Sequence, residues 1–167
     1  MPYKPQLHIV LYQPEIHYNT GNIGRTCVAV GAKLWLVKPL GFNIDDASVR
    51  RAGLDYWDLL ELEVVENWSD LVARLPAASH WYFTKKAIRN YDDPQYQPGD
   101  VLVFGSESQG LPDEVLDRPE RCLRIPMRPD VRCLNLSNAA AVACYEAVRQ
   151  WGGQLSWNDS ATGNSPP

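Results

Sequence analysis

Residues 125–138, IPMRPDVRCLNLSN, pass from an apolar stretch through a proline-bounded loop into an alanine-rich segment. Pro126 and Pro129 stiffen the loop, because each proline ring fixes its own backbone φ angle. Ser137 stands at the start of the alanine-rich segment and is predicted to cap a helix there. A strand that leads through a stiff loop into a capped helix is a ligand-binding layout, so we expect function to centre near residues 125–138.

Outward from this stretch, short and nearly continuous apolar runs are typical of parallel strands that are buried on both faces. Such runs occupy residues 7–12, 34–37, 81–84 and 101–104, with a weaker one at 122–125. Helices are expected between and after them, at about 22–31, 46–53, 69–75 behind the cap candidate Ser69, 112–118 opening at Pro112, and 138–151. This alternation predicts an α/β fold, in which helices cover a parallel sheet on both faces.

Length and composition favour one domain. The chain has 167 residues, of which 45% are hydrophobic and 22% charged, as in ordinary globular proteins. We expect this domain to span residues 1–153, and we expect residues 154–167, which are rich in small and polar side chains, to form a disordered tail.

The same sequence argues against a membrane or metal partner. No apolar run reaches the roughly 20 residues that a bilayer requires, and the amino terminus lacks the apolar core of a secretory signal, so a cytoplasmic protein is expected. The four cysteines are widely spaced and form no C-x-x-C pair, which favours reduced, mostly buried thiols over a zinc site or disulfides.

The charge balance does not suggest a general polyanion binder. The net charge is −4 and the isoelectric point is near 5.3, whereas non-specific nucleic-acid affinity depends on many contacts of lysine and arginine with phosphate. Basic side chains could still converge locally, although taken alone each group is better explained as a solvated face. These groups are Arg50 with Arg51, Lys85 with Lys86 and Arg89, and Arg124 with Arg128 and Arg132.

Three loops carry candidate chemistry. The first, NTGNIGRT at residues 19–26, combines two glycines and Arg25 at an expected helix start, where free backbone N–H groups favour an anion such as phosphate. A plain glycine turn with Arg25 in solvent explains the same spacing equally well. Both interpretations stay open on the residues alone.

The second loop, FGSESQGL at residues 104–111, begins with Gly105, which allows close approach of the backbone, and places Glu107 in a crowded turn. It lacks the G-x-S-x-G spacing of a serine hydrolase. The chain also contains no P-loop, and no G-x-G-x-x-G follows the first predicted strand, which disfavours ATP and NAD. The third loop places apolar side chains beside Cys133 and Asn135, so it could hold an adenine ring, although a buried crossover loop remains the alternative.

Taken in order, NTGNIGRT, FGSESQGL and RIPM followed by LNLSNA at residues 124–139 resemble the three motifs of the SPOUT methyltransferases, in particular the tRNA 2′-O-methyltransferases of the TrmH-like group. The resemblance covers about residues 7–151. It implies a single SPOUT domain whose carboxyl-terminal part threads a deep trefoil knot and forms a pocket for S-adenosylmethionine, within a homodimer.

The resemblance also implies site residues. Cofactor-binding positions would be Tyr82, Phe83, Thr84, Gly105, Ile125, Met127, Cys133, Leu134 and Leu136, with Cys133 binding through its backbone. Arg25 would carry the central catalytic role, supported by Asn19, Glu107, Asn135 and Ser137. Since a guanidinium has no lone pair to offer at neutral pH, we expect Arg25 to stabilise developing negative charge and to clamp a phosphate rather than to accept the proton.

The implied reaction is methylation of a ribose 2′-hydroxyl in tRNA, at the wobble nucleotide 34, a cytidine or uridine derivative. On this interpretation Arg50, Arg51, Lys86, Arg128 and Arg132 would contact tRNA phosphates. Other possibilities remain open here: another tRNA position, ribosomal RNA, a knotted RNA-binding module without catalysis and, more distantly, a small-molecule α/β enzyme.

Overall fold

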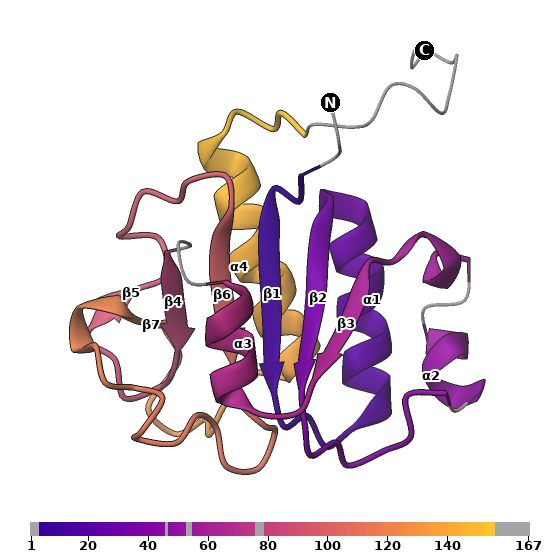
Figure 1. Cartoon of the computed structure of the whole chain (residues 1–167). Helices are drawn as coiled ribbons and strands as arrows, with labels where there is room; N and C mark the ends of the chain where they lie inside the picture. The colour runs from indigo at the N-terminus through magenta and orange to yellow at the C-terminus, as the bar shows by residue number, and fades with distance from the viewer. Residues whose placement is uncertain (1–3, 46, 53–54, 76–78, 156–167) are drawn as a thin grey trace.

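The computed structural model describes residues 4–45, 47–52, 55–75 and 79–155. Within these residues seven strands form one sheet in the order β3-β2-β1-β6-β4-β7-β5, and every neighbouring pair is parallel (Figure 1). The strands are β1 (Leu7–Tyr12), β2 (Ala32–Val37), β3 (Leu62–Val65), β4 (His80–Phe83), β5 (Arg89–Asn90), β6 (Asp100–Phe104) and β7 (Cys122–Arg124).

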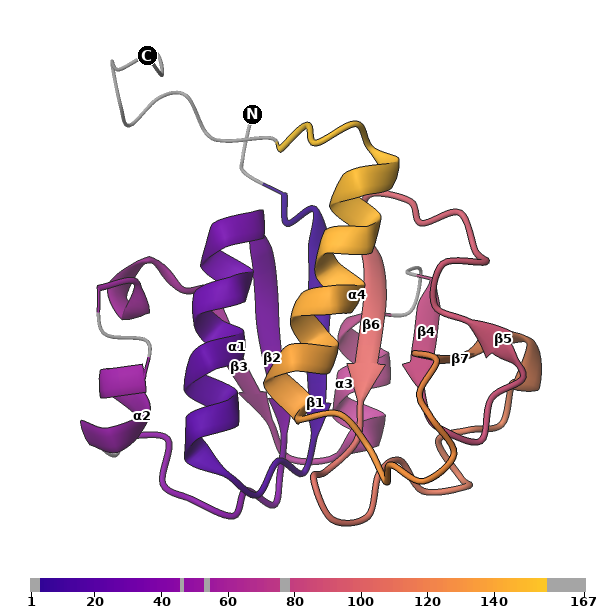
Figure 2. The ribbon, with the colours of Figure 1, turned by 180° about the vertical axis from the view of Figure 1, so that it is seen from behind.

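Helices cover both faces of this sheet. Helix α1 (His17–Val30) and helix α4 (Leu136–Gln150) pack against each other on one face, and helix α3 (Trp68–Arg74) lies on the other (Figures 1 and 2). The remaining helical segments that the structure describes are α2 (Ala47–Ala52), η1 (Trp57–Leu59) and η2 (Pro119–Arg121). The predicted α/β fold with a covered parallel sheet is therefore confirmed.

The core is divided by the sheet into two clusters. In β1, Leu7, Ile9 and Leu11 pack with residues of α1 and α4, whereas Val10 packs with Leu71 of α3 on the opposite face. This division follows from the strand geometry, because successive side chains point to opposite faces. These four side chains of β1 are fully buried, and each contributes roughly 1.5–3 kcal/mol of hydrophobic stabilisation.

The core on the α1 side extends to the carboxyl-terminal end of the described chain. Leu155 packs against it, two residues beyond the expected domain end at residue 153. The rest of the expected disordered tail, residues 156–167, lies outside the described residues.

Helix α1 differs from the prediction in its start. It begins at His17, so residues 19–26 lie inside the helix and form neither an anion-binding loop nor a glycine turn. Hydrogen bonding within the helix occupies the backbone N–H groups from Thr20 onward, since the Thr20 N–H already donates to the carbonyl of Ile16 and only the first N–H groups of a helix lack a partner within it. The glycines misled the prediction, since Gly21 and Gly24 are tolerated at buried positions where the helix packs closely.

Helix α4 also begins earlier than predicted. Its N-cap is Asn135 rather than Ser137, because Asn135 Oδ1 accepts hydrogen bonds from the backbone N–H groups of Ser137 at 2.9 Å and Asn138 at 3.4 Å. Asn67, not Ser69, caps α3 in the same way. Asparagine and serine serve equally well as caps, so the sequence could not separate these candidates.

Three further elements differ. Residues 112–118 form a turn at 113–115 and irregular chain instead of a helix, and β3 and β5 were not predicted. Strand β5 has two residues, which is too short for a periodic signal, and β3 is an edge strand that carries Glu63 among its apolar residues.

The carboxyl ends of the parallel strands meet at one edge of the sheet, the lower edge in Figure 1. From β1 the chain continues into α1 on one face, whereas from β6 it continues to Leu111 and Val115, which pack on the face of α3. The connections therefore diverge between β1 and β6. In open α/β sheets such a divergence is the usual place for ligands.

Candidate functional site

A cavity of about 670 Å³ opens at the carboxyl ends of β4, β6 and β7, beside the start of α4. Its volume lies within the range of small-ligand pockets, roughly 300–1,000 Å³. The lining combines parts of three sequence stretches that are far apart in the chain: residues 83–86, 104–111 and 123–136, together with Ile16, Asn19 and Ala139.

One part of the cavity is apolar and flat. Phe83 and Phe104 line it with stacked rings, whose centroids are 4.6 Å apart at an interplanar angle of 18°. Further apolar lining comes from Leu123, Ile125, Met127, Leu134, Leu136 and Ala139. An aromatic heterocycle of a ligand would find its apolar contacts here.

Gly105 shapes the adjacent wall. A Cβ atom at this position would lie 2.1 Å from the carbonyl carbon of Gly110 and 2.3 Å from the backbone nitrogen of Leu111. The loop therefore folds back directly onto the Cα atom of Gly105. The expected close backbone approach at Gly105 thus occurs within the 105–111 loop itself.

Glu107 ties this loop to the start of α1. Its Oε2 accepts a hydrogen bond from the backbone N–H of Glu15 at 2.8 Å, and its Oε1 accepts from the N–H of Ile16 at 3.1 Å and from Asn19 Nδ2 at 3.2 Å. The residue preceding α1, Ile16, has no side chain that could cap the helix, so a carboxylate from the loop after β6 supplies acceptors at this positively polarised end. These three bonds connect the loop after β6 to the first turn of α1.

Asn19 continues the network to the third motif. Its side chain is 5% exposed, and its Oδ1 accepts a hydrogen bond from Asn135 Nδ2 at 3.0 Å. The Oδ1 of Asn135 accepts in turn from the hydroxyl of Ser137 at 2.5 Å. All four residues expected to assist catalysis, Asn19, Glu107, Asn135 and Ser137, thus belong to one hydrogen-bonded network.

Cations surround the rim of the cavity. Lys85, Lys86, Arg124 and Arg132 all line it and are exposed. Lys86 Nζ lies 3.4 Å from a carboxylate oxygen of Asp113, an exposed contact that contributes little binding energy. Four cations around an apolar cavity suit a ligand with a flat apolar part and anionic neighbours, such as RNA phosphates.

Comparison with known proteins places the chain in a family. The model of the SpoU rRNA methylase family matches residues 6–145, which is most of the chain. The chain belongs to the SpoU rRNA methylase family. A relative from Methylovorus glucosotrophus, named tRNA (cytidine(34)-2′-O)-methyltransferase, is 50% identical over 144 residues, which are 85% of this chain and 94% of the relative.

Solved structures of SpoU-type proteins share the fold. One, from work on 2′-OH methylation of C/U34 on tRNA, is 44% identical with a TM-score of 0.84, covering 89% of this chain and 97% of that one. AviRb from Streptomyces viridochromogenes, solved in complex with AdoMet, is 22% identical with a TM-score of 0.81, covering 90% of this chain and 60% of that one. The latter similarity establishes the fold alone.

In this SpoU family member most of the expected cofactor positions line the cavity. Phe83, Thr84, Gly105, Ile125, Met127, Cys133, Leu134 and Leu136 all do so. Tyr82 does not, because its side chain is buried on the α3 face of the sheet, where its ring centroid lies 6.3 Å from that of Trp68. Burial raises the pKa of the Tyr82 hydroxyl.

Arg25 also lies away from this cavity. It is exposed on α1, and its guanidinium carbon is 5.3 Å from the ring centroid of Tyr56, a cation–π contact. Among the residues expected to bind RNA, Lys86 and Arg132 line the cavity, whereas Arg128 pairs with Asp130 at 3.2 Å and Arg51 is exposed on α2. The Arg50 side chain lies outside the described part of the structure.

Sequence reasoning missed several lining residues. Among them are Ile16, Phe104, Lys85, Ser108, Leu123 and Arg124. The signal that could have identified Phe104, Leu123 and Arg124 is their position at the carboxyl ends of β6 and β7.

Cysteine placement agrees in part with the expectation. Cys27, Cys122 and Cys144 are buried, and burial raises the pKa of the Cys144 thiol to about 12, whereas Cys133 is exposed at the cavity. Across the described residues, His, Cys, Asp and Glu side chains form no group of three or more that could hold a metal ion. In the same part of the chain, no helix has the length and apolar character needed to cross a membrane.

Proposed function

We propose that this chain transfers a methyl group from S-adenosylmethionine to the ribose 2′-hydroxyl of nucleotide 34 in tRNA. The observation that carries the proposal is the hydrogen-bonded junction of Asn19, Glu107 and Asn135, which joins three separate motifs beside one cavity. The relative from Methylovorus glucosotrophus, half identical to this chain, supports nucleotide 34 as the target.

The cavity fits the cofactor. The stacked pair Phe83 and Phe104, together with Leu134, offers apolar contacts for an adenine ring, and the loops after β6 and β7 offer backbone groups for hydrogen bonds. Cys133 is best suited to bind through its backbone, since a thiol is a weak hydrogen-bond partner. When bound, the cofactor supplies an electrophilic methyl group on a sulfonium, and the protein supplies position and charge.

In the transfer the 2′-oxygen of the ribose would form a bond to the methyl carbon as the bond from that carbon to sulfur breaks and leaves a neutral thioether. The 2′-oxygen would lose its proton. We assign to Arg25 the stabilisation of the negative charge that develops on this oxygen and the binding of a neighbouring phosphate, and we assign the proton to water. Asn19, Glu107, Asn135 and Ser137 act as positioning residues, since their hydrogen bonds connect α1 and α4 with the loop after β6.

A homodimer would explain why Arg25 lies outside the cavity of its own chain. Tyr18 and Arg25 are exposed on the outer side of α1, and Val142 and Tyr145, 38% and 50% exposed, lie on the outer side of α4. Helices α1 and α4 pack together on the side of the sheet seen in Figure 2, so these exposed side chains all come from the two helices that form this surface. We propose that a second copy covers this surface and that each Arg25 serves the site of its partner.

Three further features belong to the proposal because of the family resemblance. The carboxyl-terminal segment that ends in α4 threads a trefoil knot, a single domain spans residues 1–153 and extends to Leu155, which packs against the core, and the protein acts on tRNA in the cytoplasm. The course of the chain supports the knot. Strand β7 lies beyond β4 in the sheet, and after β7 the chain returns to the middle of the sheet, where α4 packs against α1 and β6.

The test is methylation of unmodified tRNA transcripts by the purified chain with labelled cofactor, followed by mapping of the modified nucleotide. We expect one 2′-O-methyl group, at nucleotide 34, and a dimer by sedimentation. A chain that binds the cofactor yet methylates another nucleotide or ribosomal RNA would overturn the assigned target. A chain that does not bind the cofactor at all would overturn the proposed activity.

A further inference from the structure

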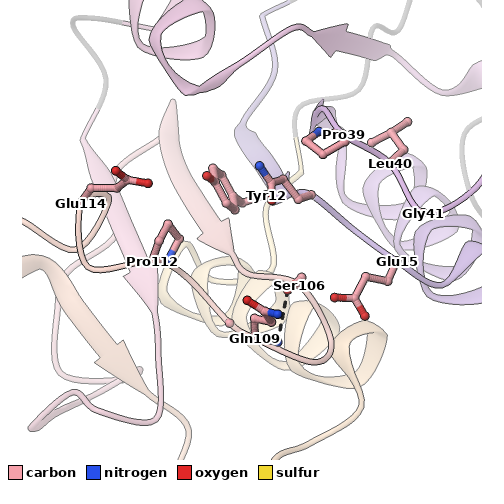
Figure 3. Close-up of a pocket in the computed structure, with 11 residues that line it drawn as sticks. Tyr12, Glu15, Pro39, Leu40, Gly41, Ser106, Gln109, Pro112 and Glu114 are labelled. Carbon is pink, nitrogen blue, oxygen red and sulfur yellow. Dashed lines mark hydrogen bonds between the residues drawn. The ribbon is translucent and has the colours of Figure 1, made fainter.

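A second cavity, of about 490 Å³, lies beside the first at the carboxyl edge of the sheet. It is formed by the loops that follow β1, β2 and β6. Figure 3 shows Tyr12 in the centre, with Pro112 and Glu114 on one side, Pro39 and Leu40 on the other, and Ser106 and Gln109 below. This second cavity lies between the ends of β1 and β6, where the chain connections diverge to opposite faces of the sheet.

The two cavities share a wall. Ser106, Gln109 and Gly110 line both of them. Hydrogen bonds brace this wall: the Gly110 N–H donates to the Ser106 carbonyl at 2.9 Å, the Gln109 N–H donates to Ser106 Oγ at 3.3 Å, and the Ser108 hydroxyl donates to Glu15 Oε1 at 2.5 Å. A ligand in one cavity is therefore separated from a ligand in the other by a single short loop.

The chemistry of the second cavity is opposite to that of the first. Its charged lining residues are Glu15 and Glu114, and neither lysine nor arginine is among the lining residues. A phosphate would be repelled here, whereas the cations at the rim of the first cavity would attract it. Carboxylates accept hydrogen bonds and donate none, so they favour a group that carries N–H donors.

The remaining lining suits a flat heterocycle. Tyr12 offers an aromatic face, Pro39, Leu40 and Pro112 offer apolar surface, and the amides of Gln13 and Gln109 can each donate and accept hydrogen bonds. Aromatic stacking combined with side-chain hydrogen bonds is how proteins bind an unstacked base of single-stranded RNA.

The backbone of Gln13 provides an independent observation. This residue follows β1 directly and has a φ angle of 51°, in the left-handed region that favours glycine. Its N–H donates to the carbonyl of Val37 at 2.9 Å, which helps to hold the strained conformation. A glycine would adopt this conformation without strain. Strained residues that retain a side chain cluster at ligand sites, where the side chain contributes to binding.

We infer that the second cavity holds a nucleobase with an exocyclic amino group, cytosine or adenine, from the same RNA whose ribose faces the first cavity. This inference rests on the proposed function, since it places the base of the target nucleotide or of a neighbour across the shared wall. Glu114 accepts from the amino group, Gln13 binds the ring edge, and Tyr12 stacks on the ring.

The experiment uses anticodon stem-loop RNAs in which cytosine or adenine, at nucleotide 34 or either neighbour, is replaced singly by pyrimidin-2-one or purine. These analogues lack only the amino group. In the wild type, removal of the amino group at one position raises the KM for RNA about tenfold, because the carboxylate that the bound base covers loses its partner. In Gln13→Gly and in Glu114→Ala the same analogue raises the KM by no more than about twofold. This is the result expected when the replaced side chain and the amino group act together in binding.

Two readouts separate binding from folding. Gln13→Gly relieves backbone strain, so its thermal stability stays equal to or above that of the wild type while its KM for RNA rises, whereas a purely structural Gln13 would leave KM unchanged. Cofactor affinity stays within about twofold of the wild type, because Gln13 and Glu114 line the second cavity alone. The matched control is Glu61→Gln, an exposed carboxylate outside both cavities.

Equal KM values for every analogue in the wild type, or an undiminished penalty in both variants, overturn the inference. If the wild type methylates no RNA, the proposed function fails, and the cavity is then tested by NMR titration with cytidine, adenosine and uridine. Shifts at Tyr12 and Gln13 with cytidine or adenosine, and not with uridine, support the amino-group site. Absence of such shifts overturns it.

Discussion

Asn135 donates a hydrogen bond from Nδ2 to Oδ1 of Asn19 at 3.0 Å, across 116 positions of sequence. The same side chain caps α4 through Oδ1, so one amide both begins the last helix and holds the first helix. Asn19 in turn donates to Glu107, which connects both helices to the loop after β6. The cavity wall is therefore built from contacts that form only when distant parts of the chain have met.

Replacement of Asn135 by serine and by alanine separates these two functions. Serine still caps α4 but is too short to reach Asn19, whereas alanine loses both contacts. We expect Asn135→Ala to be less stable than Asn135→Ser by about 1 kcal/mol, the usual contribution of a cap. Asn135→Ser should itself be less stable than the wild type by about 1 kcal/mol, because it loses the hydrogen bond to Asn19, and it should bind the cofactor more weakly. Urea unfolding and calorimetric titration measure both quantities. Wild-type values for Asn135→Ser would show that the bond to Asn19 contributes nothing.

Arg25→Lys tests the assigned role of the guanidinium. Lysine keeps the charge but loses the planar fork that binds two oxygens, so we expect kcat to fall about 100-fold, as for removal of one donor to a developing oxyanion. Cofactor affinity should not change, because the role assigned to Arg25 is contact with the ribose oxygen and a phosphate of the RNA rather than with the cofactor. Single-turnover kinetics measure the rate, and Arg74→Lys on the opposite side of the molecule is the control. Near-normal turnover of Arg25→Lys would instead favour a lysine that can act as a base.

Gly105→Ala tests the close approach within the cavity wall. The new Cβ atom would meet backbone atoms of Gly110 and Leu111, which cannot rotate away. We expect a loss of stability of about 1–3 kcal/mol from the forced backbone shift, together with weaker cofactor binding. The matched control is Gly24→Ala in α1, where the Cβ atom would meet Leu60 Cδ2 at 3.0 Å, the end of a flexible side chain. If both variants unfold at the same denaturant concentration, the wall is more adaptable than the contacts indicate.

The sequence predicted the layers of the fold better than the geometry of the site. Residues 7–12 were identified to the residue, because an apolar run of this length is typical of a buried strand and too short for an ordinary helix. The first helix was expected to begin near residue 22 because Gly21 resembles a turn, and local spacing could not show that the helix begins at His17 and buries both Gly21 and Gly24. The link from Asn135 to Asn19 spans nearly the whole chain and leaves no periodic pattern.

His8 provides a prediction about pH. Burial first, and then the nearby charges of Lys33 and His80, lower the pKa of His8 from 6.5 to about 4, and its Nδ1 accepts a hydrogen bond from Trp35 Nε1 at 3.1 Å. Between pH 6.5 and 4 the unfolded chain therefore binds a proton that the folded chain does not bind, so stability rises with pH across this window.

We expect the folded protein to lose roughly 1–2 kcal/mol from this source as the pH falls from 6.5 to 4, after allowance for solvent screening of a half-exposed group. Urea unfolding at a series of pH values measures the loss, and His8→Gln should flatten the profile in this window. His17→Gln is the control. A His8→Gln profile parallel to that of the wild type would contradict the assignment.

The cations at the rim predict that the binding of tRNA and the binding of the cofactor differ in their sensitivity to salt. Raising the salt concentration should weaken tRNA binding and leave cofactor affinity nearly unchanged, because phosphate contacts release counterions. Arg132→Ala, at the cavity, should reduce the slope of log K against log salt by about one. Arg128→Ala should change it less, since Asp130 already neutralises Arg128 at 3.2 Å. Equal salt sensitivity of tRNA and cofactor would reject this division.

The loop of residues 106–110 separates two cavities with opposite charge preferences, and neither cavity can change shape there without changing the other. If an occupant of one cavity shifts this loop, the affinity of the other cavity for its ligand changes, and the effect must be reciprocal. If the methyl donor binds first and orders this loop, the RNA meets a preformed surface. Methyl transfer then follows a compulsory order of ligand addition. Product RNA would then leave before the spent donor.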